Sequence, residues 1–281
     1  WAANYVIENG PYELCGVGCT VPNLGKRPGV STDPENLEGY AAVFAPNNGG
    51  NPEHIFSVNY DESTAGGMNF SQMTLHYSSQ FTWNLEAQSW NGYASLQEFY
   101  ESYEDSDARK AANFIVGPQL DSGGSAILDY ATDDDEIPLN YTPQINELEP
   151  NSLREAGARL GKFSFKQFGR PDMDNNFPIK RLGEMYLTRA EARARQNGWN
   201  DAGALADVNL IRNRAGVSSF STMDPDTFLA ERGREMFQES SRQTDLIRFG
   251  KYDDAWWEKP VSEDYKSVFP IPFEQIQASC G

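Results

Sequence analysis

The chain has 281 residues, of which 39% are hydrophobic and 23% are charged, and its formal net charge is −18 at pH 7. A chain of this length can bury a sizeable core. The excess of acidic side chains argues against nucleic acids, anionic lipid surfaces and acidic polymers as partners, because the protein's field would repel each of them. A neutral ligand matches this charge better.

The sequence opens in the middle of a structural pattern. Residues 1–10, WAANYVIENG, are typical of the end of a helix that stops at Gly10, and no charged-then-apolar signal segment precedes them. No run of about 18 apolar residues occurs, so no membrane-spanning helix is predicted. We expect the chain to be either a processed protein or the second half of a larger one.

The chain has few cysteines. Cys15 and Cys19 stand within Cys-Gly-Val-Gly-Cys, and Cys280 lies near the other end. The short spacing permits a local disulfide between the first two, but free thiols are equally compatible with it. A zinc site would need further ligands that only His54 and His76 could partly supply, so no metal ion or cofactor is predicted.

The first part of the chain is rich in loops. Residues 11–52 hold many Gly, Pro and Asn residues, a composition typical of successive turns. The best strand candidate is HIFSVNYD at 54–61, and GKFSFKQFG at 161–169 offers a second. A helix is predicted over 95–104, and the helical pattern continues in SDARKAANFI at 106–115.

The block 177–250 is the most regular part of the sequence. A first helix is predicted to begin after Pro178 and to stop at Gly198, and a second to start at an Asp201 cap and to stop at Gly216. Each has one apolar face, and small residues on both faces allow the two axes to approach closely. This antiparallel pair is therefore predicted to be tetratricopeptide-like.

A third helix is predicted to begin with Pro225 in its first position. Its charged residues are spaced three to four apart, which favours a row of ion pairs along one helix face over a catalytic pair of carboxylates. These residues are Glu231, Arg234, Glu235, Glu239, Arg242 and Asp245. The acidic run at 133–136 is interpreted as a solvated loop, with a calcium site as the alternative.

Common catalytic motifs are missing from the sequence. It contains no Gly-x-Ser-x-Gly elbow, no His-Glu-x-x-His pair and no phosphate-binding Gly-rich loop. We therefore predict that the protein is not an enzyme. A glycoside hydrolase that uses two carboxylates is the more distant alternative, since 41 acidic residues always permit such a pair.

Residues 76–93 combine aromatic side chains with amides and hydroxyls and carry one formal charge. Sugars present apolar C–H faces surrounded by hydroxyl groups, so flat rings with neighbouring amides suit them. The predicted glycan-binding residues are Tyr77, Trp83, Asn84, Gln88, Trp90 and Asn91. For Trp90 a buried structural role is favoured over ligand contact, whereas for Trp83 the two roles are evenly balanced.

Several segments together carry a resemblance to a known family. The helical run from FPIKRLGEMYLTRAEARARQNG to LIRNRAGV, the charged residues that follow it up to Gly250, and FPIP at 269–272 resemble the C-terminal helices of the SusD/RagB family. Earlier segments at 40–61, 89–109 and 141–145 resemble that family too. Ser240-Ser241, Phe249 and the helical Gly233 depart from its usual pattern.

The resemblance implies a mainly α fold with tetratricopeptide-like helices and a large loop-rich region that has a few short strands. Residues 1–176 would form a loop-rich glycan-binding region with short helices and strands, and 177–250 the tetratricopeptide-like block. Residues 251–281 would form an extended segment that packs back on the helices. All three would belong to one continuous SusD-like domain that lacks its N-terminal half.

The resemblance also implies a function. Members of this family capture oligosaccharides or polysaccharides at the cell surface, without covalent chemistry, and deliver them to a SusC-like TonB-dependent outer-membrane transporter. The expected location is the outer membrane, reached through a lipid anchor that this chain does not contain, and no nucleic-acid partner is expected. The alternative is a tetratricopeptide-like protein-interaction module that binds no sugar.

Overall fold

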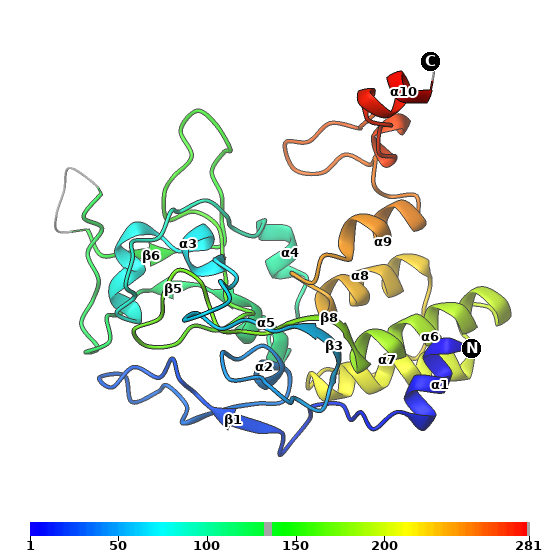
Figure 1. Cartoon of the computed structure of the whole chain (residues 1–281), viewed down its shortest axis with the longest axis horizontal. Helices are drawn as coiled ribbons and strands as arrows, with labels where there is room; N and C mark the ends of the chain where they lie inside the picture. The colour runs from blue at the N-terminus through cyan, green and yellow to red at the C-terminus, as the bar shows by residue number, and fades with distance from the viewer. Residues whose placement is uncertain (132–136, 280–281) are drawn as a thin grey trace. The chain divides into compact units, whose positions relative to one another are not determined.

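The computed structural model describes residues 1–131 and 137–279 (Figure 1). Most elements are short, and helices outweigh strands, which confirms the predicted mainly α fold with a loop-rich region. The elements in chain order are α1 Ala2–Asn9, β1 Thr20–Pro22, β2 Asn36–Glu38, α2 Tyr40–Val43, β3 His54–Val58, α3 Phe70–Thr74, η1 Tyr77–Thr82, α4 Gln97–Glu101, α5 Ala108–Asn113, β4 Phe114–Ile115, β5 Gly117–Pro118, β6 Asn140–Tyr141, β7 Arg159–Leu160, β8 Phe177–Arg181, α6 Leu182–Asn197, α7 Ala202–Arg214, α8 Pro225–Glu235, α9 Arg242–Arg248, η2 Asp264–Ser267 and α10 Phe273–Ser279.

The chain divides into two compact units, Trp1–Asp224 and Pro225–Gly281. The predicted domain limits at 176 and 250 stay predictions. Within the described residues, no helix combines the length and the apolar character needed to cross a membrane. The acidic run at 133–136, its calcium alternative and Cys280 lie outside the described residues.

Helices α6 and α7 form the predicted antiparallel pair in the first unit, and α1 packs on α6 (Figure 1). Asp201 caps α7 by accepting a hydrogen bond from the Ala204 N–H at 2.9 Å, as predicted. The buried Asp207 carboxylate on α7 pairs with Arg189 of α6 at 2.7 Å. Small facing residues and this ion pair together fix the two helices.

The start of α6 differs from the prediction. Phe177–Arg181 form strand β8, which pairs antiparallel with β3 from Val58↔Phe177 to His54↔Arg181, and α6 begins only at Leu182. The prediction was wrong here because the backbone of this segment bonds to a strand about 120 residues earlier. Strand β3 itself confirms the strand predicted in 54–61.

Two other predicted elements are shorter or missing. In 161–169 the structure has turns and irregular chain, and the only strand nearby is β7, so the predicted second strand is wrong. Within the helix predicted over 95–104, only the shorter α4 forms. Helix α5 then continues the helical character, as expected. Aromatic packing explains the irregular stretch: the Phe163 ring lies 5.3 Å from that of Phe44, so burial fixes this segment without a sheet.

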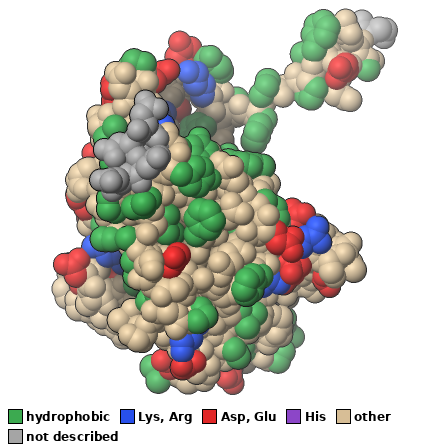
Figure 2. Space-filling view, turned by 90° about the vertical axis from the view of Figure 1, so that its left-hand side faces the viewer, with side chains coloured by type: hydrophobic (Ala, Val, Ile, Leu, Met, Phe, Trp, Pro, Cys, Tyr) green, Lys and Arg blue, Asp and Glu red, His purple; other side chains and the backbone are tan. Residues whose placement is uncertain are grey.

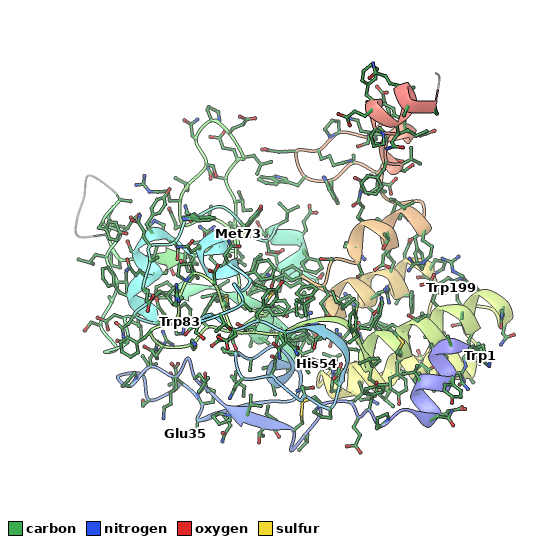
Figure 3. All side chains as sticks on the ribbon, in the orientation of Figure 1. Trp1, Glu35, His54, Met73, Trp83 and Trp199 are labelled. Atoms are coloured by element: carbon green, nitrogen blue, oxygen red, sulfur yellow. A yellow bond between two sulfur atoms is a disulfide. The ribbon has the colours of Figure 1, made fainter. Side chains whose placement is uncertain are left out.

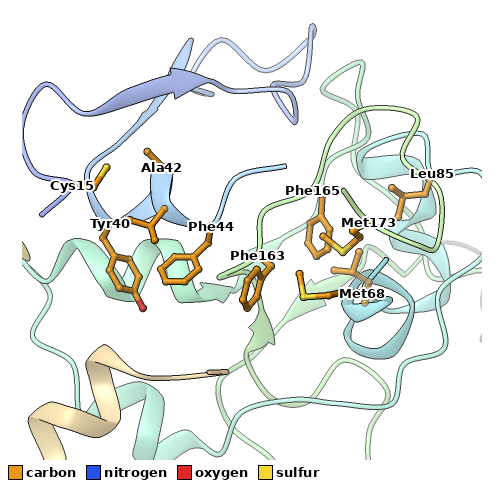
Figure 4. Close-up of a cluster of buried hydrophobic side chains, with 11 residues drawn as sticks. Cys15, Tyr40, Ala42, Phe44, Met68, Leu85, Phe163, Phe165 and Met173 are labelled. Carbon is orange, nitrogen blue, oxygen red and sulfur yellow. The ribbon is translucent and has the colours of Figure 1, made fainter. Parts of the chain in front are cut away.

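The main hydrophobic core of the first unit lies under the loops (Figure 4). It joins α2 to residues that flank α3 and η1, between 68 and 85, and to the irregular chain at 163–173. Cys15 lies in this core, fully buried, and forms a disulfide with Cys19 across a Cα–Cα distance of 5.2 Å. The question left open by the sequence is thus resolved in favour of the bridge.

A buried charge cluster joins the loops to the helices. The Glu53 carboxylate, which has no exposed surface, accepts hydrogen bonds from Arg181 at 2.7 Å and from Arg214 at 2.8 Å. It also accepts the Cys15 N–H at 3.1 Å. Since breaking a buried pair leaves an uncompensated charge, this cluster fixes the position of the Cys15 loop against β8 and α7.

In the second unit, the predicted third helix is two helices, α8 and α9. The chain between them contains Gln238 and Ser240 with φ angles of 59° and 61°, which no helix accommodates. The single-face row of ion pairs is therefore wrong. Asp245 instead reaches back from α9 to Arg232 of α8 at 2.9 Å, while Arg234 pairs with the buried Glu231 within α8.

Candidate functional site

The predicted binding stretch begins with the short helix η1, Tyr77–Thr82, and continues as irregular chain. The His76 side chain caps η1, because its Nδ1 accepts the Ser78 N–H at 3.1 Å. Figure 3 labels Met73 and Trp83, which lie before and after η1 in the loop-rich part of the first unit. The aromatic residues of the stretch differ sharply in burial.

The segment 88–93, here called the aromatic loop, presents two aromatic side chains to solvent. Trp90 is 54% exposed and Tyr93 is 55% exposed. The structure therefore contradicts the favoured prediction that Trp90 is a buried anchor. Asn91 adopts a φ of 57° directly after Trp90, as Asn84 does after Trp83, so this left-handed turn alone does not determine whether the tryptophan is buried.

The backbone of the aromatic loop is fixed against the end of α3. The Asn91 N–H donates to the Leu75 carbonyl at 3.0 Å, and the Tyr93 N–H donates to the Met73 carbonyl at 2.9 Å. The Thr74 hydroxyl donates to the Tyr93 carbonyl at 3.0 Å. The exposed rings are thus carried by an ordered loop, which lowers the entropic cost of using them to bind a ligand.

Gln88 also belongs to the aromatic loop, and its side chain is exposed. The backbone carbonyl of Gln88 accepts a hydrogen bond from the Gln72 side chain at 3.3 Å. The Oδ1 atom of Asn91 is buried and has no hydrogen-bond partner among the described residues. The loop therefore brings together Gln88, Trp90 and Asn91 of the predicted set, as well as Tyr93.

Trp83 and Asn84 have a different environment. The Trp83 ring is half-buried and lies 4.5 Å from the Phe165 ring, at an interplanar angle of 52°. The Asn84 amide donates to the Ser122 hydroxyl at 2.8 Å and to the Gln167 side chain at 3.1 Å. Both residues hold loops together, and their predicted contact with a glycan stays a prediction.

Tyr77 lies near two exposed rings, one of which the sequence interpretation missed. Phe81 is 49% exposed and Tyr130 is 46% exposed, and their ring centroids are 6.4 Å apart. Burial, then the Asp129 carboxylate and then Tyr77 raise the pKa of the Tyr130 hydroxyl. No local signal identifies Tyr130, because it reaches this position from a distant loop.

A buried polar network lies beneath these rings. His76 Nε2 is 3.3 Å from the Asp129 carboxylate, and both side chains are almost completely buried. Since Nδ1 accepts the Ser78 N–H, the neutral ring carries its proton on Nε2, towards Asp129. The nearby Ser79 hydroxyl pairs with the Tyr141 hydroxyl instead. The ring thus faces the Ser78 N–H and the Asp129 carboxylate, while Ser79 bonds to Tyr141 and not to the histidine.

A hollow of about 500 Å³ opens beside this network. Its polar lining residues are Asp129, Asn140, Thr142, Ser152, Arg154 and Glu155, and Ile137, Leu139 and Leu153 supply apolar surface. Among the described residues, no group of three or more His, Cys, Asp or Glu side chains is arranged to hold a metal ion.

Comparison with known proteins shows which family this chain is similar to. Residues 154–279 match the model of the SusD family. The starch-binding protein SusD of Bacteroides thetaiotaomicron is 34% identical over 113 residues, a match that covers 37% of this chain and 20% of that protein. A SusD-like protein of Formosa agariphila is 26% identical over 277 residues, which cover 89% of this chain and 51% of that protein. The predicted resemblance to the SusD/RagB family is thus confirmed.

A solved structure shares the fold over almost the whole chain. Surface glycan-binding protein A of Bacteroides thetaiotaomicron in complex with laminarihexaose aligns with a TM-score of 0.65 and 22% identity. The alignment covers 99% of this chain and 56% of that one. This chain therefore shares the fold of that glycan-binding protein, and it spans about half the length of that protein and of the Formosa agariphila protein.

Proposed function

We propose that the protein binds neutral glycans without covalent chemistry, and that the aromatic loop is its main contact surface. The observation that carries this proposal is the exposure of Trp90 and Tyr93 on a loop whose backbone is hydrogen-bonded in place. Rigid aromatic rings stack on the C–H faces of sugars at little entropic cost. Gln88 supplies an exposed amide that can bond to the hydroxyls around those faces, and Asn91, whose Oδ1 is buried, can contribute only its Nδ2 donors.

The surface charge supports a neutral ligand. The net charge of −18 repels anionic polymers. On the face seen in Figure 2, hydrophobic side chains form separate patches among uncharged ones, and most charged side chains lie towards its margins. The laminarihexaose bound by the structural relative makes a β-glucan series a reasonable first ligand to test.

We further propose that the complete protein acts at the cell surface. It would be held to the outer membrane by a lipid anchor and would deliver its glycan to a SusC-like TonB-dependent transporter. This part of the proposal rests on the sequence similarity to SusD. Tyr77, Trp83 and Asn84 remain proposed as secondary contacts, since Tyr77 and Trp83 keep part of their surface exposed.

Affinity electrophoresis of the intact protein in gels that contain neutral polysaccharides tests this function. Retardation by at least one polysaccharide, such as laminarin, is the expected result. A protein that migrates unretarded in every gel would refute the proposal. Release of reducing sugar during incubation with the retarding polysaccharide would instead favour the hydrolase alternative.

A further inference from the structure

The aromatic loop and the hollow are physically joined. Arg159, which is 3% exposed, donates from Nη1 to the Tyr93 carbonyl at 3.4 Å and from Nη2 to the Arg154 carbonyl. In addition, the Ser95 N–H donates to the Ala158 carbonyl at 2.8 Å. One guanidinium therefore connects the backbone below an exposed ring to the backbone of a residue that lines the hollow.

The hollow has the size and lining of a ligand site. Its volume of about 500 Å³ lies within the range of roughly 300–1,000 Å³ that is usual for pockets of small ligands. Leu139 and Leu153 provide apolar surface, and Asn140, Thr142 and Ser152 provide groups that both donate and accept hydrogen bonds. A sugar unit needs both kinds of contact.

Arg154 provides a donor that lacks an acceptor. Its Nε is buried, has no hydrogen-bond partner among the described residues and lies 3.8 Å from the Asp129 carboxylate, beyond hydrogen-bond distance. The Arg154 side chain as a whole is 41% exposed, and the residue lines the hollow. Because Nε is buried, a ligand oxygen that enters the hollow would bond to the exposed part of the Arg154 guanidinium instead.

The charges around the hollow indicate which sugars it would accept. The carboxylates of Asp129 and Glu155 line it together with the single guanidinium of Arg154. An acidic sugar would be repelled by the two carboxylates and attracted only by the Arg154 guanidinium, whose charge already faces Asp129. A neutral hydroxyl can accept from Arg154 and donate to Glu155, so neutral units suit both partners.

We propose that a glycan held at Trp90 and Tyr93 continues into this hollow, so that the preferred ligand is a neutral oligosaccharide of several units, with Arg154 and Asn140 as contacts for its distal units. This inference rests on the proposed function. It adds a second set of contacts and a dependence of affinity on chain length.

Calorimetry of the intact protein with glucose, laminaribiose and laminarihexaose tests the inference. If laminarin does not bind in affinity electrophoresis, the ligands are instead the dimer and the hexamer of the polysaccharide that retards the protein. The wild-type protein should bind the hexamer at least about tenfold more tightly than the dimer, as one or two further charged hydrogen bonds predict. Arg154→Ala and Asn140→Ala should each reduce hexamer affinity, the former by about tenfold, and leave dimer affinity within about twofold.

Arg170→Ala is the matched control, because Arg170 is 48% exposed and does not line this hollow. It should leave hexamer affinity unchanged, and melting curves establish that each variant is folded. Equal affinity of dimer and hexamer, or hexamer affinity that is unaffected in both hollow variants, would overturn the inference and leave the proposed function standing. Tighter binding of a polyuronate hexamer would overturn the neutral class. A wild-type protein that binds no glycan at all refutes the proposed function and this inference with it.

Discussion

Two tryptophan–asparagine pairs in the candidate surface have opposite roles, although their local sequences are alike. Asn84 and Asn91 both adopt positive φ angles, of 51° and 57°, directly after Trp83 and Trp90. Trp83 nevertheless packs on Phe165, whereas Trp90 is 54% exposed. The difference comes from Phe165, a partner that is distant in the sequence. The sequence therefore predicts an aromatic, amide-rich stretch but does not predict which of its rings is buried.

Stability measurements distinguish these roles. Trp83→Ala removes a packed ring and should lower the free energy of unfolding by about 2–3 kcal/mol, below the usual loss for a fully buried aromatic because this ring is partly exposed. Trp90→Ala should change it by less than about 0.5 kcal/mol, as exposed substitutions usually do. Urea titration gives both values, and the reverse order would contradict the assigned environments.

His76 makes stability depend on pH. Burial, opposed in part by the Asp129 carboxylate, lowers the pKa of folded His76 below its ordinary value of 6.5; the other charged groups that face it are Arg159, Arg154 and Glu155. The unfolded chain therefore takes up this proton first as the pH falls. The stability that neutral His76 contributes is complete above about pH 6.5 and is lost as the pH drops from there through the folded pKa.

We expect the wild-type free energy of unfolding to fall between about pH 7 and pH 5, and to fall less in His76→Gln, which cannot gain a proton. Urea titrations at the two pH values provide the comparison. All other titratable groups are common to both proteins, so they cancel. Parallel pH profiles would show that His76 does not titrate differently in the folded and unfolded chains.

At the scale of elements, local patterns predicted the helix pair α6 and α7 and missed the non-local pairings. The apolar faces and terminal glycines of α6 and α7 were sufficient, because those signals lie within each helix. Strand β8 was missed, since Phe177–Arg181 becomes a strand only through its pairing with β3. The break between α8 and α9 was missed for a related reason: Asp245 and Arg232 pair across the turn and hold it.

The glycine within α8 also has a tertiary explanation. A Cβ at position 233 would lie 2.8 Å from Nη1 of Arg242, the same atom that donates to the Leu229 carbonyl at 2.7 Å. Gly233→Ala should therefore gain about 1 kcal/mol of helix propensity and lose a comparable amount at Arg242, for a net change near zero.

In an Arg242→Ala background, the same substitution should stabilise the protein by about 1 kcal/mol, because the new methyl group meets no guanidinium. Thermal or urea unfolding of the four proteins of this double-mutant cycle yields the coupling. A Gly233→Ala effect that is the same in both backgrounds would contradict the proposed contact.

For the whole molecule, the large negative charge predicts how binding responds to salt. Stacking and hydroxyl contacts with a neutral glycan involve no counterion release, so affinity should change by less than about twofold between roughly 0.05 and 0.5 M NaCl. Calorimetric titrations at both salt concentrations measure this. A steep loss of affinity would indicate an anionic ligand or a charge-dominated site.

The central claim is that exposed rings on a fixed loop bind a neutral glycan. It is tested most directly by calorimetric titration of the polysaccharide that retards the protein into wild type, Trp90→Ala and Trp1→Ala. Trp1→Ala is the control, because Trp1 is 96% exposed and lies directly before α1. We predict that Trp90→Ala binds about tenfold more weakly, as loss of one stacked ring implies, and that Trp1→Ala binds like wild type. Equal affinity of wild type and Trp90→Ala would contradict the account.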